Sequence, residues 1–119
     1  SLSQLVQDYN KEIILAEVAH AWRIVENGFI DTAQERIAGF PANPLGQRQV
    51  LDLLNQIVSS LPDKKGRGIY YWEPLMPADH GFGGWADNMT LVDNHAQVME
   101  GIEAFLFERN QYKPDASRG

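Results

Sequence analysis

Two short apolar runs with a long amphipathic segment between them constrain this fold more than any other feature of the sequence. Residues 12 to 18 read EIILAEV, and residues 68 to 72 read GIYYW. Neither run alternates regularly between apolar and polar residues, which is typical of strands buried on both faces in a parallel sheet. We therefore expect two parallel strands, connected by a helix that crosses over between them.

The segment between the two runs has the periodicity of one amphipathic helix. Its apolar stripe repeats with the helical period and consists of Val50, Leu51, Leu54, Ile57, Val58 and Leu61. Asn43 is a good N-cap residue, Pro44 suits the first helical position, and Pro62 ends the pattern. The sequence predicts a helix from residue 44 to about residue 61.

Two further helices flank the strands in the predicted order. Residues 2 to 9 share an apolar face and look like the last turns of a helix that begins upstream. A final helix is predicted from about residue 95 to 108, with Asn94 and Gln97 as its capping box. Its inward residues would be Val98, Ile102, Phe105 and Leu106, and we expect residues 111 to 119 to form a flexible tail. The order helix, strand, helix, strand, helix belongs to the α/β class.

The length of 119 residues fits one domain, but two strands are too few for a complete parallel sheet. Strands this apolar need a neighbour on each edge and cover on each face. The first residues also contain neither an initiator Met nor a signal-like segment. We therefore expect the chain to be cut from a longer protein, with the remaining segment or a second copy covering the strand edges.

Composition argues against several classes of function. Sixteen acidic and ten basic side chains give a formal net charge of −6, which disfavours nucleic acid and anionic membranes as partners. No apolar run approaches the roughly 20 residues that span a bilayer. The chain has no cysteine, and its three histidines are too scattered for a metal pattern. We expect neither a metal nor a cofactor. A neutral polar substrate is compatible with the net charge of −6.

The segments that follow the two predicted strands, residues 19 to 43 and 73 to 94, are long, whereas the return from helix to strand at residues 62 to 67 is short. Barrels that carry chemistry build their sites on the long loops after the strands. Glu17, at the end of the first strand, is therefore a candidate nucleophile toward the anomeric carbon of a sugar. A structural ion pair with a neighbouring arginine has equal weight on sequence alone.

Aromatic and polar residues near the same loops are candidates for contact with a sugar. Trp72 and Trp85 offer indole faces that can stack on the apolar C–H face of a sugar ring. Glu73 could bond a sugar hydroxyl or form a salt bridge, and His20, just after the first strand, could line a cleft. Tyr71 points to the opposite face of its strand from Trp72, which favours core packing.

The string GIYYWEP at residues 68 to 74 resembles the last barrel strand of glycoside hydrolase family 53, the arabinogalactan endo-β-1,4-galactanases. Ala16 and Glu17 after an aliphatic run are similar to the seventh strand of that family, NPLGQ at residues 43 to 47 to the start of its seventh helix, and WADN at residues 85 to 88 to its eighth loop. The likeness covers nearly the whole chain in order and spacing. Residues 18, 20 and 21 are Val, His and Ala here, where the family usually has Thr, an aromatic residue and Pro.

This resemblance implies that residues 1 to 119 are about the last quarter of a (β/α)8 TIM barrel, containing strands seven and eight with their helices. It implies a retaining, endo-acting hydrolase of β-1,4-galactan, with Glu17 as nucleophile, Trp72 as a platform beneath the sugar, and Glu73 and Trp85 near the cleft. The acid/base Glu would come from the fourth strand, outside this chain, so the chain alone would be inactive. The family also suggests an extracellular or periplasmic location.

Two alternatives stay open at this point. One is a barrel hydrolase that acts on another polysaccharide, and the other is a non-catalytic carbohydrate-binding or assembly module.

Overall fold

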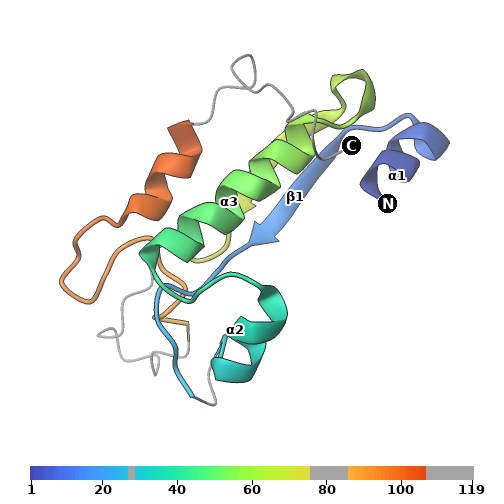
Figure 1. The fold of residues 1–119 in the computed structure, drawn as a ribbon. Helices are drawn as coiled ribbons and strands as arrows, with labels where there is room; N and C mark the ends of the chain where they lie inside the picture. Colours follow the sequence, from blue (N-terminus) through green and yellow to red (C-terminus); the bar gives the residue numbers. More distant parts are fainter. Residues whose placement is uncertain (27–28, 76–85, 107–119) are drawn as a thin grey trace.

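The computed structural model describes residues 1–26, 29–75 and 86–106, in which helices and strands alternate along the chain (Figure 1). The elements are α1 (Leu2–Tyr9), β1 (Ile13–Val18), α2 (Thr32–Ala38), α3 (Pro44–Ser59), the 3-10 turn η1 (Pro62–Lys64), β2 (Gly66–Tyr71) and the 3-10 helix η2 (Glu100–Leu106). The two strands and the long connecting helix are the predicted ones. The predicted tail and Trp85 lie outside the described residues.

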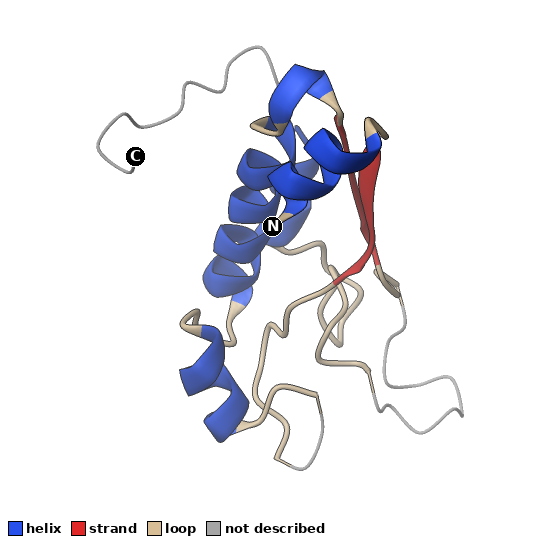
Figure 2. Ribbon diagram, turned by 90° about the vertical axis from the view of Figure 1, so that its right-hand side faces the viewer, coloured by secondary structure: helices blue, strands red, loops and turns tan. Residues whose placement is uncertain are grey.

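The strands β1 and β2 pair in parallel, as predicted, and α3 packs over one side of the pair (Figure 2). The centre of the core is formed by Leu51 of α3 together with Leu91 and Ala104. Three half-buried side chains from the strands pack against this centre, namely Val18, Ile69 and Tyr71. The core is thus a layer between the sheet, α3 and η2.

The second face of the sheet is open in the described part of the chain, as expected for two such strands without the rest of their sheet. Ile14 is 48% exposed and Tyr70 is 64% exposed. The physical reason is that neither a further strand nor a second helical layer covers this face within the described ranges. An exposed apolar face and two open strand edges are what the sequence predicts for these two strands in isolation.

A β-bulge interrupts β1 near its carboxyl end. Leu15 pairs with Ile69 and Val18 pairs with Tyr71, so two residues of β1 stand opposite the single residue Tyr70 of β2. The bulge breaks the two-residue alternation of the strand. As a result Leu15 and Val18 are both half-buried, although they are three residues apart, while Glu17 between them is exposed.

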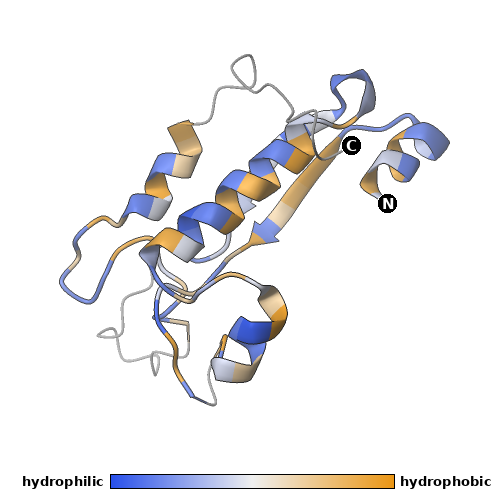
Figure 3. Cartoon of the chain, viewed as in Figure 1, coloured by the Kyte–Doolittle hydropathy of each residue, from blue (hydrophilic) through white to orange (hydrophobic). Residues whose placement is uncertain are grey.

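Helix α3 begins as the sequence predicts. The Asn43 side chain accepts a hydrogen bond from the Gly46 N–H at 2.7 Å, and Pro44 occupies the first turn. The helix carries an apolar stripe along a largely polar surface (Figure 3). Leu51 and Val58 of that stripe are buried, which fixes the face that packs on the strands.

Helix α2 lies within the long segment after β1 and was not predicted. Its N-terminus has a reciprocal capping box, in which the Asp31 carboxylate accepts from the Gln34 N–H and the Gln34 side chain accepts from the Asp31 N–H. Gly39 ends it in the left-handed conformation at a φ of 76°. The helix has no buried residues, so hydrophobic periodicity gave no signal for it.

The last predicted helix differs from the observed one in its start, its cap and its buried face. The chain first forms a turn at residues 93 to 97, where the Asp93 carboxylate, not Asn94, accepts from the N–H groups of His95 and Gln97. The helix η2 starts later, and its buried residues are Gly101 and Ala104. The four residues predicted to face inward are all exposed: Val98, Ile102, Phe105 and Leu106. Small residues face α3 because the two helices approach closely.

Candidate functional site

The carboxyl ends of the two strands lie side by side, which brings the strongest candidate residues together. The Trp72 N–H donates a hydrogen bond to the Val18 carbonyl at 2.9 Å, directly after the last strand pair. Glu17 precedes Val18 and sits in the bulge with an exposed side chain. Within the described ranges no hydrogen bond or ion pair engages its carboxylate. The structural ion pair considered above therefore has no partner in this part of the chain.

Trp72 and Glu73 follow β2 at the same end of the sheet. Trp72 is half-buried, and its ring centroid lies 6.1 Å from that of Phe29, with the ring planes inclined by 60°. Glu73 is exposed and has a positive φ of 51°, so the backbone turns sharply just before Pro74. This turn directs the chain out of the sheet immediately after the indole.

His20 is only 3% exposed, and its ring Nε2 lies 3.2 Å from the Pro41 carbonyl. Burial lowers the pKa of this imidazole below 6.5, although hydrogen bonding to Pro41 and the nearby Glu35 carboxylate act in the opposite direction. The His20 ring therefore links the start of the long segment after β1 to its end at Pro41. Contact of His20 with a substrate stays a prediction.

A buried polar network, which the sequence did not reveal, joins both strand-end loops to α3. The Gln47 side-chain N–H groups, fully buried at the start of α3, reach the carbonyls of His20 and Thr90, each at 2.9 Å, and the Tyr71 hydroxyl at 3.2 Å. Burial raises the pKa of Tyr71 to about 12, so its hydroxyl keeps its proton and donates to the Met89 carbonyl. One side chain of α3 thus ties together the loop at His20 and the loop at Thr90, which are far apart in sequence.

The close approach of η2 to this network requires a glycine. A Cβ placed on Gly101 would lie 2.5 Å from the Gln47 side-chain oxygen. The missing side chain at Gly101 therefore lets η2 pack directly over the buried amide.

A second set of contacts joins the two loops farther from the sheet. The Trp22 ring N–H donates to the Asp87 carbonyl at 3.1 Å, and its backbone N–H donates to the Asn88 carbonyl at 2.8 Å. Arg23 forms a salt bridge with the Asp87 carboxylate. The Asn88 amide, fully buried, donates to the carbonyls of Arg23 and Phe29. The loop that carries Phe29 is therefore fixed to the loop after β2.

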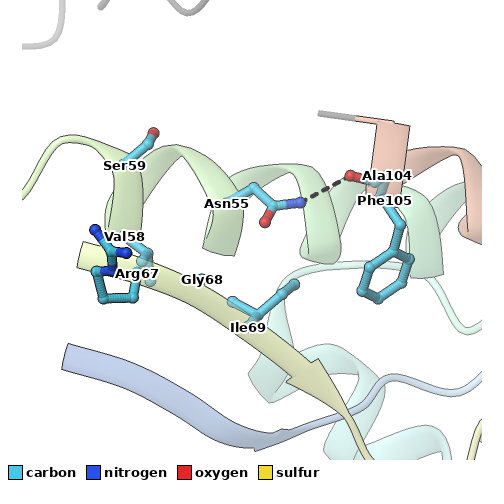
Figure 4. Close-up of a pocket in the computed structure, with 8 residues that line it drawn as sticks. All are labelled: Asn55, Val58, Ser59, Arg67, Gly68, Ile69, Ala104 and Phe105. Atoms are coloured by element: carbon cyan, nitrogen blue, oxygen red, sulfur yellow. Dashed lines mark hydrogen bonds between the residues drawn. The ribbon is translucent and has the colours of Figure 1, made fainter. Parts of the chain in front are cut away.

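A cavity of about 230 Å³ lies elsewhere, between the second half of α3, the start of β2 and η2 (Figure 4). Asn55, Arg67 and Phe105 are among the residues that line it, and the Asn55 side chain bonds the Ala104 carbonyl across one wall at 2.9 Å. None of the predicted site residues lines this cavity. The candidate residues Glu17, Trp72 and Glu73 lie instead at or next to the carboxyl ends of the two strands.

The searched part of the chain contains no cluster of three or more His, Cys, Asp or Glu side chains that could hold a metal ion. A membrane-spanning helix is likewise not found among the described residues.

Structural comparison defines the class of this fold: the chain aligns with part of a TIM barrel. The Ignisphaera aggregans GH53 catalytic domain superposes with a TM-score of 0.78 at 24% sequence identity, over 87% of this chain and 32% of that one. The family follows from the sequence, because residues 1–105 match the model of glycosyl hydrolase family 53. The chain belongs to glycosyl hydrolase family 53.

Full-length relatives are considerably longer than this chain. A Niallia circulans protein named "Uncharacterized protein in bgaB 5'region" is 29% identical over 114 residues, covering 87% of this chain and 31% of that protein. The probable arabinogalactan endo-beta-1,4-galactanase A of Aspergillus tubingensis is 28% identical over 106 residues, covering 88% and 29%. The chain spans less than a third of the length of these relatives.

Proposed function

We propose that this chain is the carboxyl-terminal part of a retaining endo-β-1,4-galactanase, with β1 and β2 as strands seven and eight of its barrel. The supporting observation is the hydrogen bond from Trp72 to Val18, next to the exposed carboxylate of Glu17. It sets an acidic group and an indole at adjacent strand ends, the edge on which barrel enzymes build their sites. The substrate class comes from relatives named as arabinogalactan galactanases.

In this proposal Glu17 attacks the anomeric carbon of the galactose residue at the cleavage point and forms a covalent glycosyl-enzyme. A second carboxyl group protonates the departing sugar oxygen and then activates the water that releases the product. Trp72 supports the sugar from below through its apolar face. Glu73 and Trp85 border the cleft, and the second carboxyl group belongs to barrel strands outside these residues.

The Glu17→Gln variant tests the nucleophile in the barrel protein that carries this chain. We expect its turnover of β-1,4-galactan to fall by at least about 10³-fold, because the amide keeps the shape of the side chain but cannot form the glycosyl ester. Glu12→Gln is the matched control, because Glu12 is also exposed and pairs only loosely with Arg67 at 3.7 Å. Near-normal turnover of Glu17→Gln would refute the assignment.

Azide rescue distinguishes loss of the nucleophile from loss of the fold. In Glu17→Ala, azide can enter the vacated space and attack an activated aryl β-galactobioside, forming an α-linked galactosyl azide as the aryl oxide leaves. The inverted product identifies the side chain that normally attacks that carbon.

Binding of galactan without turnover in the unaltered protein would instead favour a carbohydrate-binding module.

The natural polysaccharide and the location of the protein are part of the same proposal. Turnover of galactan in preference to mannan and glucan supports a galactanase, and the reverse preference supports a hydrolase of another polysaccharide. Because galactan is a polymer outside the cell, we propose an extracellular or periplasmic location, which fractionation of the producing cells tests.

A further inference from the structure

We infer that Phe29 is a substrate-binding residue of this site and forms, with Trp72, an aromatic corner that receives the sugar chain. This inference rests on the proposed function. Phe29 comes from the loop after β1 and Trp72 from the end of β2, so the corner is built from both strand-end loops.

The geometry of the two rings supports a shared surface. Their centroids are 6.1 Å apart and their planes are inclined by 60°, an arrangement within the range of favourable aromatic pairs. Such an inclination leaves two apolar ring surfaces at an angle to each other. A sugar that stacks on the indole of Trp72 with its C–H face would also meet the Phe29 ring at its side.

Phe29 is partly exposed beside Trp72. Its side chain is 41% exposed, although it contacts a half-buried tryptophan. Part of the Phe29 ring that contacts Trp72 is therefore accessible to a ligand.

The backbone beneath Phe29 is held more firmly than its exposed position requires. The amide of Asn88, fully buried, donates to the Phe29 carbonyl and to the Arg23 carbonyl. Trp22 in the same loop bonds the Asn88 carbonyl in return. A ring on a fixed backbone loses little conformational freedom when a ligand binds, which favours binding.

The test measures galactan hydrolysis by Phe29→Ala, Phe29→Leu and the control Ile37→Ala in the barrel protein that carries this chain. Ile37 is an exposed apolar residue of α2, 82% exposed. We expect Phe29→Ala to raise KM for β-1,4-galactan about two- to tenfold, the size of one aromatic contact, with kcat within about twofold. Phe29→Leu should give a smaller rise in KM, and Ile37→Ala should change neither constant.

The outcomes separate this inference from the proposed function. An unchanged KM for Phe29→Ala overturns the inference, and so does a loss of kcat that follows a fall in melting temperature in both Phe29 variants. If Phe29→Ala does not fold, Phe29→Leu decides by the same criteria. If Glu17→Gln and Trp72→Ala lose activity while the Phe29 variants behave as the native protein, the function stands and only the role of Phe29 fails.

Discussion

At the scale of single residues, the side chains that hold the candidate site in place are buried and polar. Gln47 and Tyr71 satisfy backbone groups of loops that come from distant parts of the chain. Buried hydrogen bonds contribute modestly when they are made, but an unpaired buried group costs considerably more. The stability of the loops therefore depends on a few individual atoms.

The hydroxyl group of Tyr71 is the first of these atoms to test. Tyr71→Phe removes a donor to the Met89 carbonyl and an acceptor for the Gln47 amide. We expect the free energy of unfolding to fall by about 1–3 kcal/mol, the cost of leaving buried groups unpaired, as measured by urea unfolding. Tyr70→Phe is the matched control. The Tyr70 side chain is exposed, so loss of its hydroxyl group should leave the free energy of unfolding almost unchanged.

The imidazole of His20 makes stability depend on pH. Its pKa lies below 6.5 in the folded chain because of burial, so the unfolded chain binds more protons between the folded pKa and 6.5. Stability should therefore rise with pH through that window and level off above it. Melting temperatures of the protein and of His20→Gln, recorded from about pH 5 to 8, test this. An equally steep pH dependence in the variant would show that another group is responsible.

Residue roles were only partly predictable from the sequence. Tyr71 was expected to pack in the core because of its parity with Trp72, and it does so, with its ring edge-on to Phe105. Gln47 gave no signal, because the partners of a buried amide are set by tertiary contacts and not by neighbours in sequence. Phe29 lies in a stretch without periodicity and could not be linked to Trp72.

At the scale of elements, apolar patterns in the sequence predicted some helices and strands correctly, whereas tertiary contacts determined the start and the buried face of others. The strands and α3 carry strong apolar patterns, and the structure confirms them. Helix η2 was placed too early because Asn94 and Gln97 matched a capping pattern, whereas Asp93 makes the turn. Its packing face was also missed, because the close approach to α3 selects Gly101 and Ala104 over larger apolar residues.

The N-cap of α3 permits a direct test at this scale. Asn43→Ala removes the side-chain acceptor for the Gly46 N–H, and we expect a loss of about 0.5–2 kcal/mol of stability, as measured by chemical unfolding. Asn94→Ala should change stability very little, because Asp93 and not Asn94 accepts the local N–H groups. Equal losses in the two variants would contradict this assignment of the caps.

At the scale of the whole molecule, the dominant feature is an apolar sheet face with nothing over it in the described ranges. Ile14 and Tyr70 present this face to solvent beside two open strand edges. Such surfaces favour association with further strands. The sequence predicted this incompleteness correctly from the number of strands, whereas the loop contacts around Asp87 and Asn88 depend on tertiary structure and were not predictable.

Isolated residues 1 to 119 should therefore associate. We expect dimers or larger species in size-exclusion chromatography with light scattering, and a shift toward monomer in the double variant Ile14→Lys, Tyr70→Lys, because charges on the open face oppose pairing. A monodisperse monomer for the unaltered chain would show that the open face is tolerated in water.

The bulge in β1 has a consequence for anyone who transplants or redesigns this segment. In a regular strand Glu17 would share the inward side of Leu15, and a charge would point into the hydrocarbon between sheet and helix. The extra residue of β1 opposite Tyr70 places the Glu17 side chain on the other side of the sheet from Leu15, with the sequence unchanged. Regular pairing of the same residues, without the bulge, would therefore turn Glu17 toward the helix, so the irregular pairing of this strand is as much a part of the proposed nucleophile as its carboxylate.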